Sequence, residues 1–271
     1  MIEQLNLQGK NKVEVAIERL RTFEPQEGYY LCFSGGKDSC VIKALADMAG
    51  VKYDAHYNIT SVDPPELVRF IKETHPDVSM DYPRDKDGKV ITMWNLIPKK
   101  RMPPTRIARY CCKQLKEGSG KGRFVVTGVR WDESARRKIS RAGLELHRSV
   151  NKRICEDPDN PANAEMARYC PTAGEHVLNP IIDWTTEDVW EFIRKYELLY
   201  CELYDKGHKR LGCIGCPMST NQKKELEKNP KYKQAYLRAF GRMIQKLNDE
   251  DSSSERSWKT PEDVMRWWLE R

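Results

Sequence analysis

Four cysteines in two pairs have the number and spacing that iron-sulfur chemistry requires. Cys111 and Cys112 are adjacent, and Cys213 and Cys216 follow as a Cys-x-x-Cys pair about a hundred residues later. Four thiolates are what one [4Fe-4S] cluster needs. Adjacent cysteines cannot easily both reach one tetrahedral zinc ion, whereas a cubane offers each sulfur a separate iron. The set therefore predicts a [4Fe-4S] cluster, with buried structural cysteines or a zinc knuckle as the alternatives.

A glycine-rich turn brings a second chemistry. The hexapeptide Ser34-Gly35-Gly36-Lys37-Asp38-Ser39 separates an apolar run, 29–33, from a segment with helical apolar spacing. The glycines let the backbone approach a ligand, and the helix N-terminus directs amides at an anion. Lysine adds a positive charge and the serines add hydroxyl donors. The turn lacks the longer spacer of a Walker motif. It predicts a phosphate-binding loop, and an ordinary strand-to-helix turn is the alternative.

Arg130 is a further candidate for anion binding. It directly follows the apolar run 124–129. A planar guanidinium can clamp phosphate or sulfate through two hydrogen bonds. The alternative is a surface ion pair with Asp132 or Glu133. Ligands of parallel α/β sheets lie beyond the carboxyl ends of the strands, which favours ligand contact for Arg130.

The elements that must position these residues alternate between strands and helices. Apolar runs predict strands over 29–33, 52–59, 78–82 and 124–129. Helical spacing predicts helices over 13–23, 38–49 and 64–74, and threonine caps begin two later helices at 185 and 260. This alternation predicts an α/β fold with a doubly wound, mainly parallel sheet. The proline-rich stretch 155–174 predicts an irregular excursion.

Length and composition limit the other possibilities. At 271 residues the chain suits one large core with an appended piece, and we expect an N-terminal helix in 1–27, a main domain over 28–218 and a basic helical extension over 219–271. No apolar run approaches the ~18 residues of a membrane span, and no signal peptide is evident, so we expect a cytoplasmic protein without membrane contact. Nine cysteines in such a chain favour metal or redox chemistry over disulfides. The net charge of +7 favours phosphate-bearing partners.

The motifs together resemble the PAPS reductase family of the PP-loop ATP pyrophosphatase superfamily. The hexapeptide resembles the PP-loop. Thr60 and the Pro65-Glu66 pair match the family's segment after the second strand, where Ile59 and Ser61 replace the family's Asp and Gly. The run Gly128-Val129-Arg130, with Arg137, is similar to the family's Gly-(Ile/Leu)-Arg motif. The resemblance spans residues 28 to 218 and keeps the family's motif order.

The resemblance implies an adenine nucleotide alpha hydrolase-like fold, a bound ATP, APS or PAPS, and site residues for it. The implied nucleotide-binding residues are Ser34, Gly35, Gly36, Lys37, Asp38, Ser39, Thr60, Gly128, Arg130 and Arg137. Of these, Lys37, Asp38 and Arg130 are the catalytic candidates, and Asp38 would hold Mg2+ if ATP is the substrate. Assimilatory APS reductases and the PP-loop enzymes of DNA phosphorothioation hold a [4Fe-4S] cluster with the same cysteine arrangement. The implied metal ligands are Cys111, Cys112, Cys213 and Cys216.

One departure from the family directs the functional hypothesis. Sulfonucleotide reductases carry a catalytic cysteine in a Glu-Cys-Gly motif near the C-terminus, and no cysteine follows Cys216 here. Our preferred hypothesis is ATP-dependent adenylation and sulfur transfer, with nucleic acid as a potential acceptor. The second is a true APS or PAPS reductase whose nucleophile is Cys155, Cys170, Cys201 or a partner's thiol. The third is a nucleotide-binding redox subunit without turnover.

Some features stay open. Cys155 and Cys170 could join His147 and His176 in a second metal site, although their loose spacing disfavours it, or the two cysteines could carry reactive sulfur. Cys32 and Cys40 are expected to pack in the core. A basic tail with interspersed aromatic residues could contact a phosphate backbone, and a solvated helix face is the favoured alternative. A sulfur-donor or electron-donor protein is a further potential partner. The tail residues are Lys223, Lys224, Lys228, Lys231, Lys233, Arg238, Arg242, Tyr232, Tyr236 and Phe240.

Overall fold

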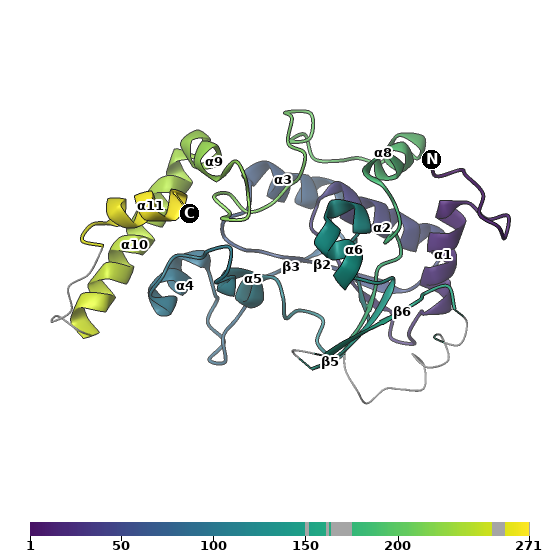
Figure 1. Cartoon of the computed structure of the whole chain (residues 1–271), viewed down its shortest axis with the longest axis horizontal. Coiled ribbons are helices and arrows are strands. Elements are labelled where there is room, and N and C mark those ends of the chain that lie inside the picture. The colour runs from purple at the N-terminus through teal and green to yellow at the C-terminus, as the bar shows by residue number, and fades with distance from the viewer. Residues whose placement is uncertain (150–151, 161–162, 164–174, 251–257, 271) are drawn as a thin grey trace. The chain divides into compact units, whose positions relative to one another are not determined.

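The chain forms an α/β fold around one mixed sheet (Figure 1). The computed structural model describes residues 1–149, 152–160, 163, 175–250 and 258–270. The sheet has seven strands in the order β3-β2-β1-β4-β7-β5-β6. Their bounds are β1 Tyr29–Cys32, β2 Tyr53–Asn58, β3 Ser79–Asp81, β4 Val125–Val126, β5 Leu144–Ser149, β6 Lys152–Glu156 and β7 Glu175–Leu178. The helices are α1 Lys12–Thr22, α2 Lys37–Ala49, α3 Pro65–Thr74, α4 Met93–Lys100, α5 Tyr110–Leu115, η1 Trp131–Glu133, α6 Ala135–Ser140, α8 Thr186–Lys195, α9 Gln222–Lys228, α10 Pro230–Glu250 and α11 Pro261–Leu269.

The strands nearest the glycine-rich turn are parallel. β1 pairs in parallel with β2 and with β4, and β4 pairs in parallel with β7. The carboxyl ends of β1 and β4 therefore lie at the same edge of the sheet, where the turn and Arg130 follow them. The predicted α/β fold with a mainly parallel sheet and a helical C-terminal region is confirmed.

The far end of the sheet differs from the prediction. β5 is antiparallel to both β7 and β6. The irregular excursion predicted from residue 155 is wrong at its start, because Cys155 and Glu156 complete strand β6. Its sequence, Lys-Arg-Ile-Cys-Glu, has charged residues at three of five positions, which hides the strand pattern. Residues 161–162 and 164–174 of that stretch lie outside the described part of the chain.

The helices that flank the turn follow local sequence signals. Asn11 caps α1 through a capping box with Glu14, and the helix packs on α2. Gly36 is the N-cap of α2, and Gly50 ends it in the left-handed conformation. Both helices match the predicted ranges within one residue. They bring the phosphate-loop candidate onto a well-packed element.

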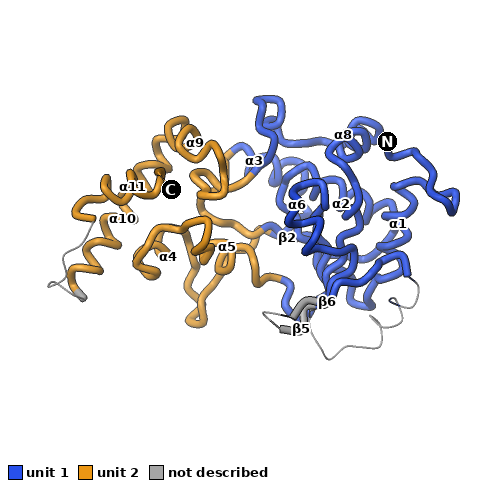
Figure 2. Tube along the Cα trace, in the orientation of Figure 1, with its two compact units in different colours: residues 1–57, 66–79, 120–211 blue, residues 58–65, 80–119, 212–271 orange. Residues whose placement is uncertain are grey.

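The chain divides into two compact units, coloured in Figure 2. Unit 1 comprises 1–57, 66–79 and 120–211, and unit 2 comprises 58–65, 80–119 and 212–271. Both are discontinuous in sequence, whereas the boundaries proposed above were continuous; those boundaries stay a prediction. Among the described residues, no helix is both long and apolar enough to cross a bilayer.

Unit 2 has its own apolar core, built on α4, α10 and α11. Trp268 is almost fully buried, its indole N–H donates to the Pro104 carbonyl at 2.6 Å, and its ring packs on that of Tyr236. Leu115 and Ile214 belong to the same buried cluster. Each is close in sequence to one cysteine pair, so this core draws the two cysteine segments together.

Replacing Gly35 by alanine should destabilise the protein more than replacing Gly50. Both have φ near +70°, at +68° and +69°, but a Cβ on Gly35 would lie 2.6 Å from Leu67 Cδ1, whereas Gly50 faces open space. We expect Gly50→Ala to lower the free energy of unfolding by about 1 kcal/mol through backbone strain alone. Gly35→Ala should cost about 1–3 kcal/mol more. Urea denaturation measures both, and equal losses would contradict the crowding seen at Gly35.

Candidate functional site

The phosphate-loop candidate is a tight turn closed by its own hydroxyl groups. The Ser39 hydroxyl donates to the Gly36 carbonyl at 2.8 Å and lies 3.2 Å from the Ser34 hydroxyl. The Gly36 amide donates to Ser34 Oγ at 3.4 Å. Gly35 provides the positive φ that the turn requires. The two predicted serines therefore shape the loop, and their hydroxyls lie at the N-terminus of α2.

Tyr204 completes this turn and was absent from the predicted site residues. Its hydroxyl accepts a hydrogen bond from the Lys37 amide at 2.9 Å, and its ring lies 5.9 Å from the Lys37 ammonium. Burial raises the pKa of Tyr204, so the phenol stays neutral at physiological pH. The Tyr204 hydroxyl thus accepts from a free amide at the N-terminus of α2, a position at which helices commonly bind anions. Tyr204 is 167 residues from Lys37 in the sequence, so only the fold brings it to the turn.

Asp38 is held between two cations. Its Oδ1 accepts from Arg130 Nε at 2.7 Å, and its Oδ2 accepts from Lys37 Nζ at 3.1 Å. Each carboxylate oxygen keeps lone-pair capacity for a further partner such as Mg2+. The Lys37 side chain is itself buried, with 6% of its surface exposed. Asp38 and Lys37, both predicted catalytic residues, are thus brought together at the start of α2.

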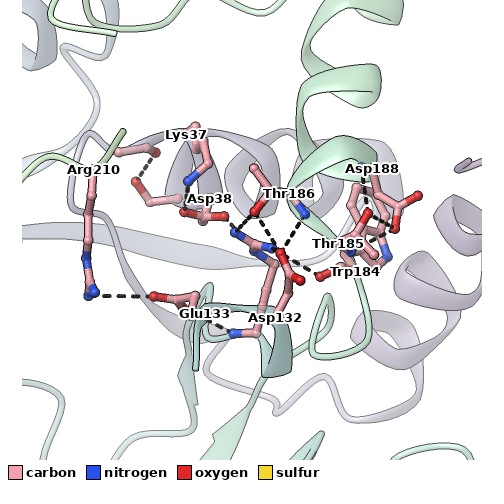
Figure 3. Close-up of polar contacts among 12 residues, drawn as sticks. Lys37, Asp38, Asp132, Glu133, Trp184, Thr185, Thr186, Asp188 and Arg210 are labelled. Carbon is pink, nitrogen blue, oxygen red and sulfur yellow. Dashed lines mark hydrogen bonds and ion pairs between the residues drawn. The ribbon is translucent and has the colours of Figure 1, made fainter. Parts of the chain in front are cut away.

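Arg130 points into the protein rather than outward. It is 1% exposed, and besides Asp38 its guanidinium donates to the Trp184 carbonyl at 3.1 Å and to Asp132 at 3.3 Å. Thr186 donates to Asp132 through both its amide and its hydroxyl, which extends the network to the first turn of α8 (Figure 3). The favoured anion contact stays a prediction. These contacts make Arg130 a group that positions Asp38.

Gly128 permits the end of β4 to approach α2. A Cβ at this position would lie 3.1 Å from Asp38 Cβ and 3.2 Å from the Asp38 carbonyl oxygen. Real Cβ atoms seldom approach so closely, and here the obstacle includes backbone. A glycine at position 128 is therefore needed so that the backbone here can pack closely on Asp38. The nucleotide contact predicted for Gly128 is a separate role.

A second cationic group lies beside this network. Arg137 bonds to Glu133, and Arg210 lies 3.6 Å from the same carboxylate, as Figure 3 shows for Arg210. Burial lowers the pKa of Arg137, and the nearby charges of Arg210 and Arg141 lower it further. Arg137 and Arg210 together carry one more positive charge than the Glu133 carboxylate offsets, which favours an anion. Arg210 had not been predicted.

The four predicted metal ligands all belong to unit 2. Cys111 and Cys112 are on α5, and Cys213 and Cys216 are in the loop before α9. All four are thiols without a disulfide. Cys111 is within electrostatic range of Cys112 and Cys213, and Cys216 is within range of Cys112 and Cys213. The hydroxyl of Thr60 lies 3.6 Å from the sulfur of Cys213.

The pair on α5 is electrically asymmetric. A hydrogen bond from Cys111, with a further one from Arg109, lowers the pKa of Cys112 to about 5. The same bond raises the pKa of Cys111. Burial raises the pKa of Cys216. Lys116, the residue that follows α5, bonds to the sulfur of Cys213, and its interaction with Cys213 raises the pKa of Lys116.

This donor set fits an iron-sulfur cluster in its chemistry. Four thiolates and a [4Fe-4S] core carry net negative charge, and Lys116 and Arg109 supply compensating cations that can also donate to sulfur. Across the described residues, no three His, Cys, Asp or Glu side chains converge on a position for one metal ion. Arg109 and Lys116 were not predicted, although their nearness to the cysteine pair in sequence was a signal.

Other predicted residues fall elsewhere. Thr60 belongs to unit 2, where its amide and hydroxyl both bond to the buried carboxylate of Asp63, so its predicted nucleotide contact stays a prediction. His176 stacks on Phe124, and Cys170 lies outside the described residues, so the second metal site remains a hypothesis. Cys201 is buried and Cys155 is exposed.

Replacing Arg130 by lysine should weaken nucleotide binding and the fold together. Lysine keeps the charge but cannot donate at once to Asp38, Asp132 and the Trp184 carbonyl. We expect about tenfold weaker ATP binding by calorimetry and a loss of about 1–3 kcal/mol in unfolding free energy. The exposed neighbour Arg136 provides the control Arg136→Lys, which should change neither. Unchanged ATP affinity in Arg130→Lys would contradict the positioning role.

Two relatives resemble the chain at the level of sequence. An uncharacterised protein of Methanocaldococcus jannaschii is 29% identical over 241 residues, which cover 85% of this chain and 51% of that protein. An adenosine 5'-phosphosulfate reductase of Oceanobacillus iheyensis is 41% identical over 205 residues, covering 69% of this chain and 70% of the reductase. The chain thus spans about half the length of the M. jannaschii relative.

A solved structure and a family model complete the comparison. The phosphate complex of phosphoadenylyl-sulfate reductase from Candida auris has a TM-score of 0.47 at 16% identity, over 78% of this chain and 96% of that one. The model of the phosphoadenosine phosphosulfate reductase domain matches residues 28–219. This match covers most of the chain and contains the glycine-rich turn, Arg130 and all four cysteines. The chain therefore belongs to the phosphoadenosine phosphosulfate reductase domain family.

Proposed function

We propose that the protein is an ATP-dependent, cluster-containing enzyme that adenylates an acceptor oxygen and replaces it with sulfur. The observation that carries the proposal is the gathering of four reduced cysteines, from segments about a hundred residues apart, within one unit of the chain. Structural cysteines have no need to collect in this way, and two cations beside them suit an anionic cluster. The phosphate-loop candidate of unit 1 supplies the nucleotide chemistry.

The proposed reaction has two redox-neutral steps. In the first, an acceptor oxygen attacks the α-phosphorus of ATP, an O–P bond forms, pyrophosphate leaves, and the hydroxyl proton goes to solvent. In the second, a sulfur nucleophile bonds to the acceptor atom that carried the oxygen, and AMP leaves with the electron pair of the broken bond. Adenylation matters because AMP is a far better leaving group than hydroxide.

The residues of unit 1 would bind and orient the nucleotide. The turn of Ser34 to Ser39 would hold the phosphates with its amides and hydroxyls, and Lys37 would neutralise developing charge on pyrophosphate. Asp38 would hold Mg2+, with Arg130 fixing its orientation. Arg137 would contact an anionic oxygen. Gly128 of unit 1 and Thr60 of unit 2 are the remaining predicted nucleotide contacts.

The residues of unit 2 would hold the cluster. Cys111, Cys112, Cys213 and Cys216 would each bind one iron, and Lys116 would offset negative charge near Cys213. A bound [4Fe-4S] cluster supplies electron storage and transfer.

Two alternatives remain. A true APS or PAPS reductase would need a nucleophilic thiol, from Cys155, Cys170, Cys201 or a partner protein, to attack the sulfate sulfur. The relatives that are APS reductases support this reading, and the burial of Cys201 counts against that residue. A redox subunit without turnover would bind nucleotide and form neither product. The cytoplasmic location of the protein and its partnership with an electron-donor or sulfur-donor protein are further predictions.

The cluster can be tested by iron content. Protein purified without oxygen, or reconstituted with iron and sulfide, should contain about four irons and four labile sulfides per chain. Replacing any of Cys111, Cys112, Cys213 or Cys216 by serine should lower both contents sharply, whereas exposed Cys155→Ser should keep them. Colourless wild-type protein after anaerobic reconstitution would refute the cluster.

The nucleotide loop can be tested by pyrophosphate release from ATP. Gly36→Asp places a carboxylate at the N-terminus of α2, where its Cβ would lie 3.3 Å from Ser34 Oγ, and the negative charge should repel phosphate. We expect turnover to fall by about a hundredfold or more. Leu199→Asp adds the same charge at an exposed position of unit 1 and should leave turnover intact. Equal activity of wild type and Gly36→Asp would remove the loop from the mechanism.

A further inference from the structure

Positive charge is concentrated in one short segment of the chain that has no acidic residue. Residues 92–116 contain seven lysines and arginines and no aspartate or glutamate. The other residues carry 40 basic and 40 acidic side chains, so this segment accounts for the whole net charge of +7. Its basic residues are Lys99, Lys100, Arg101, Arg106, Arg109, Lys113 and Lys116. So uneven a distribution indicates an anionic partner.

Helix α10 adds a row of cations next to this segment. It packs against α4, and Arg238, Arg242 and Lys246 recur every four residues along one face of it. Within the described ranges, no ion pair is recorded for Lys99, Lys100, Arg238, Arg242 or Lys246. These side chains can therefore interact with an anionic ligand, because no acidic residue of the described ranges neutralises them.

A pocket lies between these two cationic helices. It has a volume of about 290 Å³ and is lined by Thr92, Trp94, Asn95, Pro98 and Arg242. The Arg242 guanidinium donates to the Trp94 carbonyl at 2.8 Å, which fixes it at the pocket. The size lies just below the ~300–1,000 Å³ of sites for drug-sized ligands, so one ring system suits it better than a whole nucleotide. Indole, amide and guanidinium groups are the ones that stack on and hydrogen-bond an unpaired base.

We infer that α4, α10 and the segment 101–109 form a binding surface for single-stranded nucleic acid, with one base in the Trp94 pocket and the backbone along the basic residues. This inference deepens the proposed function, because it assigns the class of the sulfur acceptor. An acidic protein would satisfy the lysines and arginines but offers no planar base for the pocket. The same basic segment leads directly into Cys111 and Cys112, since Arg109 bonds to Cys112. A bound strand would therefore be led towards the cysteines of unit 2.

Fluorescence anisotropy of the full chain tests this surface without ATP or turnover. The probes are a labelled 20-nucleotide single strand of mixed sequence, as RNA and as DNA, the corresponding duplex, and labelled polyglutamate. We expect the single strand to bind most tightly and its affinity to fall with salt by a log–log slope of about 0.7 per phosphate contact. Polyglutamate bound as tightly as the single strand would overturn the inference in favour of an acidic protein partner.

Paired variants locate the surface. Lys99→Glu with Lys100→Glu should weaken single-strand binding by about tenfold or more. The matched double change Lys223→Glu with Lys224→Glu, at exposed positions of α9 in the same unit, should have a clearly smaller effect. Trp94→Ala should cost about tenfold for the single strand only, and Trp94→Phe should recover most of it. Equal losses from the two charge-reversed pairs would overturn the assignment to α4. These binding measurements need neither ATP nor a cluster. A negative result would therefore refute the nucleic-acid surface without bearing on the proposed reaction.

Discussion

The ion pair between the buried Arg130 and the partly exposed Asp38 is the constraint on which the nucleotide site depends. It joins the end of β4 to the first turn of α2, and through the Trp184 carbonyl and Thr186 it reaches α8. A buried guanidinium needs hydrogen-bond partners, and this one donates to Asp38, Asp132 and the Trp184 carbonyl. Gly128 belongs to the same arrangement, because any side chain there would push β4 away from Asp38. The conformation of the phosphate loop therefore follows from contacts made by three segments distant in sequence.

In unit 2 the corresponding constraint is hydrophobic. Leu115 and Ile214 are buried in one cluster with Tyr236, Phe240 and Trp268. Because each of the two residues is close in sequence to one cysteine pair, this cluster holds the two cysteine pairs in the same unit. The C-terminal helices thus act as the framework of the cysteine site rather than as an independent appendage. Burying aromatic side chains of this size contributes on the order of 2–3 kcal/mol each, which stabilises the positions of α5 and of the loop that carries Cys213 and Cys216.

Sequence patterns predicted the parts of the protein that are set locally. Strand β1, the glycine-rich turn and α2 form a continuous signal of apolar run, turn residues and helical spacing, and the cysteine spacing is equally direct. Strand β6 escaped prediction because three of its five residues are charged, and the antiparallel strand β5 was not predicted either. The inward orientation of Arg130 depends on partners some 50 and 90 residues away. Tyr204 could not be assigned for the same reason, because only the fold brings it to Lys37. The bond of Lys116 to Cys213 also depends on the fold, whereas its nearness to Cys112 is visible in the sequence.

Family membership leaves two reactions in competition, and the nucleotide consumed separates them. Reconstituted protein should be incubated without oxygen with ATP, APS or PAPS in parallel, with a thiol reductant and single-stranded nucleic acid present, and the products should be analysed for AMP, pyrophosphate and sulfite. Sulfur transfer through adenylation predicts AMP and pyrophosphate in equal amounts from ATP and no sulfite from APS or PAPS. Sulfite formed from APS or PAPS, with ATP left intact, would contradict the account and identify a sulfonucleotide reductase.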